Sequence, residues 1–302
     1  MKFAFIARQR SESERESPSE TVRLMCRWLG VSKSGFYASV VRSPSKRSLS
    51  NQRLKLEIRA SHEKSRRRYG APRVHAELKA QGEICGKNRV AKLMREDGLK
   101  GKKARQFKLT TLSNHNKTVA SNLLSRQFAI LNREMNTAWA GDITYLPTRE
   151  GWLYLATLID LSSRRVVGWS LDSSLEDSLT IRALRMALAT REIPRDREVL
   201  HHSDRGSQYA SRDYQLTLLE RGITPSMSRK GDCWDNAVSE SFFATLKAEI
   251  VADAKWESRS QARREVVEYL NWYNFDRRHS TLGYLTPAEY EVKMLQETSP
   301  AA

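Results

Sequence analysis

The run WAGDITY at residues 139–145 places an acid, Asp142, where a buried β-strand is expected. Two later acids have comparable surroundings. Asp204 ends a second apolar strand, and Glu240 lies in a segment with helical spacing of its apolar residues. Three carboxylates that are carried by three different elements can converge on one point. We therefore take Asp142, Asp204 and Glu240 as candidate catalytic residues.

The spacing of apolar residues from position 136 onward predicts a mixed β-sheet flanked by helices. The order of elements is βββαβαβα, which is typical of an α/β fold. If the fourth strand joins the sheet beside the first through a right-handed crossover, Asp142 and Asp204 become neighbours. The expected strands are 136–148, 152–161, 164–171, 198–202 and 223–227, and the expected helices are 176–190, 212–220 and 235–251.

The chemistry of three converging carboxylates favours a metal site. Carboxylates that are held together repel and raise one another's pKa unless a cation lies between them, and hard divalent ions such as Mg²⁺ prefer oxygen ligands. Two such ions, about 3.5–4 Å apart, can activate the attacking oxygen and stabilise the leaving oxygen of a phosphodiester displacement. We therefore expect Asp142, Asp204 and Glu240 to be metal ligands as well.

Taken singly, these acids have ordinary explanations. An Asp at a strand end is usually a turn or cap residue, and a single Glu on a helix usually faces solvent. The combination is more specific, because 35 residues separate Asp204 from Glu240. Lys247 lies seven residues beyond Glu240, two helical turns on and on the same face. An acid and a lysine placed in this way suit a site where metal and DNA phosphate lie side by side.

The charge of the chain is divided unevenly. The formal net charge is +17 and the isoelectric point is about 10.0. Residues 1–135 hold 31 Lys and Arg against 11 Asp and Glu, whereas residues 136–302 hold 21 against 24. A strongly basic segment indicates a polyanionic partner, so we expect the first part of the chain to bind nucleic acid and the second part to carry the chemistry.

Two helix-turn-helix patterns are expected in the basic part. The first has a helix that stops at Gly30 and a second helix over 33–40 with Ser32 as its N-cap; an ordinary αα-hairpin with a basic face remains the alternative. The second has helices that begin near Leu54, at Pro72 and at Lys87. A flexible basic strap over 98–105 follows, which can track phosphates.

The expected divisions of the chain are 1–48, 49–110 with the strap, a linker over 111–135, and a catalytic core over 136–295. The expected basic DNA contacts are Arg73, Arg89, Lys92, Lys102, Lys103, Arg205 and Lys230.

The remaining composition excludes several classes. The three cysteines, Cys26, Cys85 and Cys233, show no CxxC spacing and no zinc-module pattern, which favours a reducing, cytoplasmic compartment. The start of the chain lacks a long apolar segment, and no run of about 18 apolar residues occurs, so neither a signal peptide nor a membrane span is expected.

Long stretches of the sequence resemble the integrase-type transposases of bacterial insertion sequences, in the group called the insertion sequence three family, and specifically its second reading-frame product. The stretches are mutually spaced, and together they cover most of the chain. They are YGAPRVHAELKAQG at 69–82, WAGDITYLP at 139–147, LIDLSSRRVVGW at 158–169, HHSDRGSQYAS at 201–211, SMSRKGDCWDNAVSESFFATLKAE at 226–249 and YLNWYNFDRRHSTLGYLTPAEY at 269–290.

The resemblance implies a fold and an activity. The implied fold is an RNase H-like core, and Asp142, Asp204 and Glu240 correspond to the family's DDE triad. Two Mg²⁺ ions are implied, with Mn²⁺ as a substitute. The implied reactions are cleavage of the donor strand by water and transfer of the resulting 3′-OH to target DNA. The implied partners are double-stranded DNA, further copies of the chain and an upstream-frame product, in a bacterial cytoplasm.

The resemblance also implies roles for neighbouring residues. Lys247 matches the basic residue that follows the family's glutamate and contacts the element end. Asp235 and Asn236 match its DN pair, for which we expect helix capping and positioning near the DNA. The family's closing motif is expected to contact DNA through Tyr273, Asn274, Arg277, Arg278 and His279.

Other conspicuous side chains have structural explanations. His201, His202 and His279 are expected to be packed or capping residues rather than metal ligands. Trp139, Trp152 and Trp169 are expected in the core. Two other functions remain open: a DNA-binding regulator of transposition without strand transfer of its own, against which the intact triad argues, and a metal-dependent nuclease, which would not need two helix-turn-helix segments.

Overall fold

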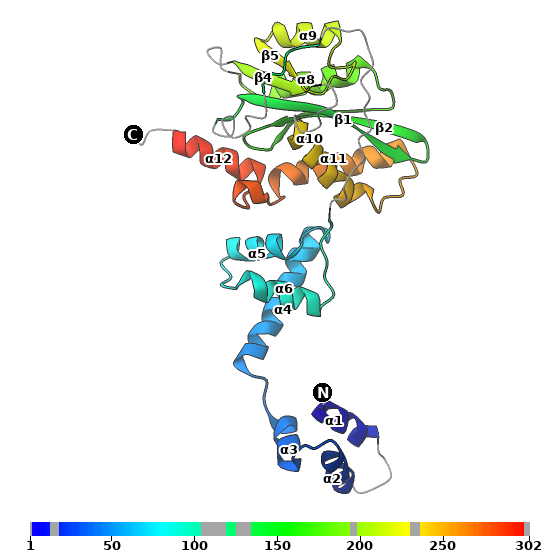
Figure 1. Ribbon diagram of the computed structural model, residues 1–302, viewed down its shortest axis with the longest axis vertical. Coiled ribbons are helices and arrows are strands. Elements are labelled where there is room, and N and C mark those ends of the chain that lie inside the picture. The colour runs from blue at the N-terminus through cyan, green and yellow to red at the C-terminus, as the bar shows by residue number, and fades with distance from the viewer. Residues whose placement is uncertain are drawn as a thin grey trace. The chain divides into compact units, whose positions relative to one another are not determined.

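The computed structural model describes residues 2–12, 18–103, 119–124, 134–193, 198–229 and 236–298 (Figure 1). The chain forms two compact units, Met1–Glu57 and Ile58–Ala302. The expectations for residues 104–105, for Lys230 and Asp235, and for most of the linker lie outside the described residues. No helix within the described ranges is both long and apolar enough to cross a membrane.

The first unit contains the first helix-turn-helix pattern. Its helices are α1 (Lys2–Glu12), α2 (Pro18–Trp28) and α3 (Lys33–Val41). Gly30 ends α2 in the left-handed region at φ 63°, and Ser32 Oγ accepts a hydrogen bond from the Gly35 N–H at 3.0 Å, so the predicted turn and cap are confirmed. The sequence analysis missed α1, which adds Ile6 to the core of Val22, Cys26 and Phe36.

The second helix-turn-helix pattern uses α5 (Ala71–Ala80) and α6 (Lys87–Glu96), both close to the predicted positions. The preceding helix, α4 (Lys46–Lys64), begins before Leu54, because Ser45 Oγ caps it by accepting from the Ser48 N–H at 3.2 Å. Its residues up to Glu57 belong to the first unit and the rest to the second.

The basic strap is anchored along its described part. The backbone N–H of Lys102 donates to the Arg68 carbonyl at 3.1 Å. A Cβ at Gly101 would lie 2.4 Å from the backbone nitrogen of Gly70, so only glycine allows this close approach. Residues 101 and 102 of the predicted strap therefore lie against the segment that precedes α5.

The catalytic part is a five-stranded mixed sheet in the order β3-β2-β1-β4-β5. The first three strands pair in antiparallel fashion, whereas β1 pairs with β4 and β4 pairs with β5 in parallel. The predicted order of elements is confirmed, and so is the crossover that puts the fourth strand beside the first. The strands are β1 (Ala138–Thr148), β2 (Gly151–Asp160), β3 (Val166–Asp172), β4 (Val199–Ser203) and β5 (Ile223–Met227).

Helices cover both faces of the sheet (Figure 1). On one face α8 (Asp177–Thr190) and α9 (Arg212–Leu219) close a core around Trp139. On the other face α10 (Ala237–Leu246) and α11 (Arg259–Phe275) pack over Leu146 and Leu155. Trp152 departs from the prediction that it is buried: it is 52% exposed and packs edge-on against Tyr145 at the rim of the sheet.

The last predicted helix is split into two kinds of helix. Residues 237–246 are α-helical, and the next five, Lys247–Val251, form a π-helical turn, η2, closed by the Ala252 N–H to the Lys247 carbonyl at 2.8 Å. A π turn widens the helix by one residue and is frequent at functional sites. Here it coincides with a buried ion pair made by Glu249. The chain ends its described part in η3 (Ser280–Leu282) and α12 (Pro287–Thr298).

Candidate active site

The first two acids meet because their strands are neighbours. In the parallel pair of β1 and β4, Gly141 lies opposite Ser203, so Asp142 and Asp204 come directly after the last registered pair. Each carboxylate is steadied by backbone: Asp142 Oδ1 accepts from the Ile143 N–H at 2.8 Å, and Asp204 Oδ1 accepts from the Gly206 N–H at 2.9 Å. Both acids therefore lie where the pairing of β1 with β4 ends, and a backbone N–H group orients each carboxylate. We call this place the sheet edge.

The residue types around Asp204 leave space for its carboxylate. A Cβ at position 206 would lie 2.9 Å from Asp204 Oδ1, so any larger residue than Gly206 would crowd the carboxylate. Both acids remain partly exposed, whereas Ser203 before Asp204 is buried. The site can thus be reached from solvent while its backbone belongs to the core.

The third acid, Glu240, is carried by α10, which packs on the sheet face opposite to α8 and α9. Glu240 lies in the first turn of α10 and is exposed, and partial burial of its carboxyl raises its pKa. Lys247 begins η2 and is half-buried; burial lowers the pKa of its ammonium group, and the Asp142 carboxylate opposes that shift. Glu240 and Lys247 therefore both lie within electrostatic range of Asp142.

The electrostatics of the site are dominated by like charges. Burial raises the pKa of Asp142 well above its ordinary value, and the Asp204 carboxylate raises it further. Glu240 acts in the same direction, while the Ile143 N–H and the Lys247 ammonium lower the pKa. The acids thus interact electrostatically, and a positive charge between them would be favourable.

The donor set has the chemistry of a hard divalent cation site, since all three groups are carboxylates. Within the described ranges, no three His, Cys, Asp or Glu side chains stand close enough together to hold one ion. Asp142 and Asp204 are the formed part of the site, and Glu240 stands nearby.

The histidines of β4 have structural roles, as the sequence predicted. His202 is buried between two hydroxyls, with Nδ1 2.9 Å from Ser226 Oγ and Nε2 3.1 Å from Ser228 Oγ. His201 Nε2 lies 2.8 Å from the Tyr214 hydroxyl, and burial lowers the pKa of His201 to about 3. Both ring nitrogens of His202 and Nε2 of His201 are thus engaged with buried hydroxyls, so these imidazoles support the packing of the strand.

Two buried residues under the site add to its floor. Asn236 Nδ2 donates to the Gly141 carbonyl at 3.4 Å, so this side chain holds the backbone beside Asp142 instead of capping its own helix. The sequence analysis missed Tyr209, whose ring lies under Gly141 and whose pKa is raised by burial, by Tyr214 and by the two acids. Its signal was its position within the same stretch as Asp204.

The basic residues predicted to contact DNA fall into two groups. Lys92 and Lys103 are exposed and Arg89 is partly exposed, so these three remain available at the surface of the helical segment. Lys92 Nζ is 4.0 Å from the Glu96 carboxylate, one turn along α6.

The other group is engaged within the second unit. Arg73 Nε donates to the Arg278 carbonyl at 2.9 Å, and Lys102 forms an ion pair with Asp253. Arg205 Nε donates to the Ser228 carbonyl at 2.7 Å. The structure therefore brings Arg73 and Lys102 to the core and Arg205 to the loop beside Asp204.

The closing motif also turns inward. Asn274 exchanges two hydrogen bonds with the backbone of Val166, each at 2.9 Å, and Arg277 is 3% exposed. His279 packs edge-on against Tyr273 at 4.7 Å between ring centroids. These side chains join elements of the protein, and the further inference below develops their role.

Three domain families match parts of the chain. The integrase core domain matches residues 132–233, which include Asp142 and Asp204, and a second integrase core domain family matches residues 221–287, which include Glu240 and Lys247. An HTH-like domain matches residues 50–107. Among solved structures, the HTLV-2 integrase catalytic core domain in complex with magnesium (dimeric form) is 17% identical, with a TM-score of 0.41, over 53% of this chain and 98% of that chain.

Two curated relatives extend along nearly the whole chain. The insertion element IS600 uncharacterized 31 kDa protein of Shigella sonnei is 43% identical over 273 residues, which are 90% of this chain and 99% of that protein. Transposase InsF for insertion sequence IS3A of Escherichia coli (strain K12) is 42% identical over 298 residues, 98% of this chain and 100% of that protein. With this identity over the full length, the chain belongs to the insertion sequence three (IS3) family of transposases, as a DDE enzyme with an integrase-type core.

Proposed function

We propose that this transposase cuts and joins DNA at the edge of its sheet, with Asp142, Asp204 and Glu240 as metal ligands. The observation that carries the proposal is that Asp142 and Asp204 are adjacent, directly after the paired residues of β1 and β4. Glu240 and Lys247 lie within electrostatic range of Asp142. In the first reaction water attacks the phosphorus at the element end, and the 3′ oxygen leaves as a hydroxyl. In the second that 3′-OH attacks a target phosphodiester and displaces its 3′ oxygen.

Each residue of the chain has a defined task in this proposal. Asp142 and Asp204 would hold the cation through carboxylates that backbone N–H groups already orient, and Glu240 would complete the ligand set. Lys247 binds the phosphate beside Asp142, because its half-buried ammonium lies within electrostatic reach of that acid. Asn236 keeps the Gly141 carbonyl in place and so maintains the direction of Asp142.

The metal supplies the part of the chemistry that side chains cannot. When bound, a pair of divalent cations stabilises charge on both the attacking and the leaving oxygen of the displacement. We propose two Mg²⁺ ions, with Mn²⁺ as a substitute, because three carboxylates and their mutual repulsion match hard cations.

We propose that the helical part of the chain holds the element end. The excess of positive charge in residues 1–135 supports binding to the phosphate backbone, with the exposed Lys92 and Lys103 and the partly exposed Arg89 as contacts. Lys230 and Arg205 are proposed to contact DNA near the catalytic edge. Arg73 and Lys102 contribute through the packing that holds this segment on the core. The active species on DNA is proposed to be a homo-oligomer, with an upstream-frame product as a further partner.

An assay with a labelled element-end fragment tests the activity. Purified protein and Mg²⁺ should yield nicked and joined products, and Asp204→Asn should keep end binding but lose cleavage by about 10³-fold, the equivalent of about 4 kcal/mol. Asp213→Asn is the matched control, because it makes the same change at an exposed acid in the first turn of α9 that is not a proposed metal ligand.

The same assay separates the transposase from a regulator that only binds. Joining that persists in Asp204→Asn at the rate of the unmodified protein would remove this site from consideration. End binding without nicks in the unmodified protein, across Mg²⁺ and Mn²⁺, would favour the regulator. Nicks without joined products would favour a simple nuclease.

A further inference from the structure

Two consecutive arginines after α11 connect the catalytic helix to the helical segment formed by residues 58–103. Arg277 reaches toward η2, which continues the helix that carries Glu240. Arg278 reaches in the other direction, toward α5. Because their backbones are joined by one peptide bond, a displacement of one side is transmitted directly to the other.

The Arg277 side of this connection is a buried ion pair. The side chains of Arg277 and Glu249 are each 3% exposed, and the guanidinium donates from Nη2 at 2.8 Å and from Nε at 3.1 and 3.2 Å to the Glu249 carboxylate. The Tyr269 hydroxyl donates to the same carboxylate at 3.0 Å. A two-pronged, buried arrangement fixes direction as well as distance. It therefore holds η2, with Lys247 at its start, in one orientation.

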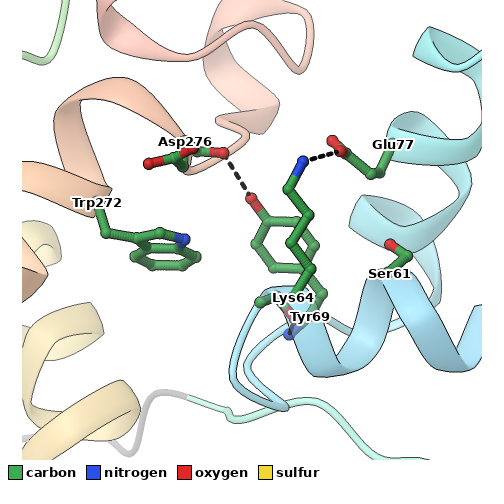
Figure 2. A pocket seen from close by; sticks show the side chains of 7 residues that line it. Ser61, Lys64, Tyr69, Glu77, Trp272 and Asp276 are labelled. Carbon is green, nitrogen blue, oxygen red and sulfur yellow. Dashed lines mark hydrogen bonds and ion pairs between the residues drawn. The ribbon is translucent and has the colours of Figure 1, made fainter.

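The Arg278 side joins the helical segment at several points. Arg278 Nε lies 2.8 Å from Glu77 Oε2, and the Arg278 N–H donates to the Tyr69 hydroxyl at 2.7 Å. Tyr69 in turn donates to the Asp276 carbonyl at 3.1 Å (Figure 2). Burial raises the pKa of Tyr69 to about 12, so the hydroxyl keeps the proton that it donates.

Figure 2 shows Tyr69 at the centre of this contact, with Trp272 and Asp276 on one side and Lys64 and Glu77 on the other. Burial alone would raise the pKa of Glu77, but the hydrogen bonds of Arg278 and Lys64 outweigh it and hold the pKa below its ordinary value. Glu77 is therefore charged and paired on both sides.

Aromatic rings complete the connection. Arg68 lies with its guanidinium carbon 4.6 Å from the centroid of the Trp272 ring and 5.2 Å from that of Tyr269. On the catalytic side, Phe242, two residues beyond Glu240, packs edge-on against Tyr273 at 4.8 Å between ring centroids. We call the set Tyr69, Glu77, Glu249, Arg277 and Arg278 the junction.

We infer that the junction sets where the DNA strand is cut relative to the bound element end. The inference rests on the proposed function, in which the helical segment binds the end and the sheet edge cuts it. The junction residues are positioning residues, since their contacts join η2 and the end of α11 to the helical segment. They hold the distance between the surface that binds the element end and the surface that cuts it, and one nucleotide step along duplex DNA advances only about 3.4 Å along the helix axis. A few ångströms of looseness would therefore move the cut by a nucleotide.

The experiment loosens the junction on the helical side and maps the nicks to single nucleotides. Glu77→Gln and Tyr69→Phe, separately and combined, remove the ion pair and the hydroxyl contact with Arg278, leave the hydrogen bond from Arg73 to the Arg278 carbonyl, and keep every acid of the active site in place. For the combined variant we expect total nicking within about threefold of the unmodified protein, and a fall of at least twofold in the fraction of nicks at its main position. Glu268→Gln is the matched control, because its ion pair with Arg66 crosses the same contact but is exposed.

A cut position as sharp in the combined variant as in the unmodified protein, with comparable total nicking, would overturn the inference. So would an equal spread of nicks in Glu268→Gln, since the buried contacts would then have no special role. If the combined variant melts at a lower temperature, the single Tyr69→Phe variant, which keeps the ring and loses only the hydroxyl, carries the test with the same criteria.

A readout without catalysis separates this inference from the proposed function. Hydrogen exchange of the backbone around residues 276–280 should speed up in Tyr69→Phe, because the Arg278 N–H loses its acceptor, and should stay unchanged in Glu268→Gln. If exchange is faster in Tyr69→Phe while the unmodified protein never nicks DNA, the junction stands and the proposed activity is overturned. Unchanged exchange in Tyr69→Phe would overturn the junction whatever the activity.

Discussion

The helical stretch Ala237–Val251 has a cluster of charges near each end, and the two clusters are built in opposite ways. At the sheet edge, Asp142 and Asp204 have the same sign, and their repulsion adds to the burial that raises the pKa of Asp142. At the junction, Glu249 and Arg277 have opposite signs and share several hydrogen bonds. Burial alone would lower the pKa of Arg277, but the Glu249 carboxylate holds it above its ordinary value.

This difference shows which of the two charge clusters is neutralised within the protein itself. Opposite charges at the junction satisfy each other, so that cluster contributes rigidity and needs no ligand. Like charges at the sheet edge gain stability only when a cation arrives. A substitution that removes one charge should therefore have opposite effects on folding at the two ends.

The largest effect is expected from breaking the junction. Arg277→Met leaves the Glu249 carboxylate buried without its partner and should lower the free energy of unfolding by roughly 3–5 kcal/mol. The double variant Glu249→Gln/Arg277→Met removes both charges and should lose much less. Chemical denaturation of the three proteins measures this, and equal losses in the single and double variants would contradict a paired, buried cluster.

A smaller effect of opposite sign is expected at the sheet edge. In metal-free buffer, Asp142→Asn relieves repulsion with Asp204 and should unfold with an equal or higher free energy. Mg²⁺ at about ten times its dissociation constant should stabilise the unmodified protein by about 1.4 kcal/mol and should stabilise the variant much less. Thermal unfolding with and without Mg²⁺ gives both numbers. The same gain with Mg²⁺ in both proteins would place the ion elsewhere.

The pH dependence of stability isolates His279 on the junction side. Burial, Arg277, Arg73 and Arg164 lower the pKa of His279 to about 2, and Tyr273 packs on its ring. The unfolded chain takes up a proton near pH 6.5 while the folded chain does not, so stability is full above that pH and falls as the pH drops toward about 2.

His279→Gln should remove this loss. Between pH 7 and pH 5.5 the unmodified protein should lose about 1 kcal/mol more than the variant. Parallel curves for the two proteins would mean that His279 is protonated in the fold. His201, which is buried and neutral in both proteins, cancels from the comparison.

The smallest effect is expected at the exposed rim of the junction. Arg66 and Glu268 are 3.1 Å apart, with 61% and 47% of their side chains exposed. Glu268→Gln should change the free energy of unfolding by less than about 0.5 kcal/mol, and less still at high salt. A change as large as that of Arg277→Met would show that exposure does not distinguish the two pairs.

Much of the architecture could be predicted from the sequence because it depends on local patterns. Alternating and helical spacings of apolar residues located the strands and most helices, and Ser32 and Gly30 marked a turn by their own conformational preferences. The helix α1 was not predicted, because its few apolar residues indicate a helix only when they are seen beside the helices on which Ile6 packs.

The candidate acids were found in the sequence, and part of their geometry could be predicted as well. The spacing of Asp204 and Glu240 and the long motifs indicated the three acids as candidates, and the crossover rule placed Asp142 beside Asp204, as the register of β1 and β4 confirms. The same motifs assigned Arg277 and Arg278 to DNA, although both are turned into the protein. A charged motif looks the same in sequence whether its partner is a phosphate or a buried carboxylate.

The sequence by itself determined the chemistry: three acids, a lysine, an uneven charge and the order of the strands. Only the tertiary structure decided which charges are neutralised within the protein, because Glu77 and Arg278 are 201 residues apart and Glu249 and Arg277 meet across a π turn. Pairing over such separations depends on packing in three dimensions, which no local pattern encodes.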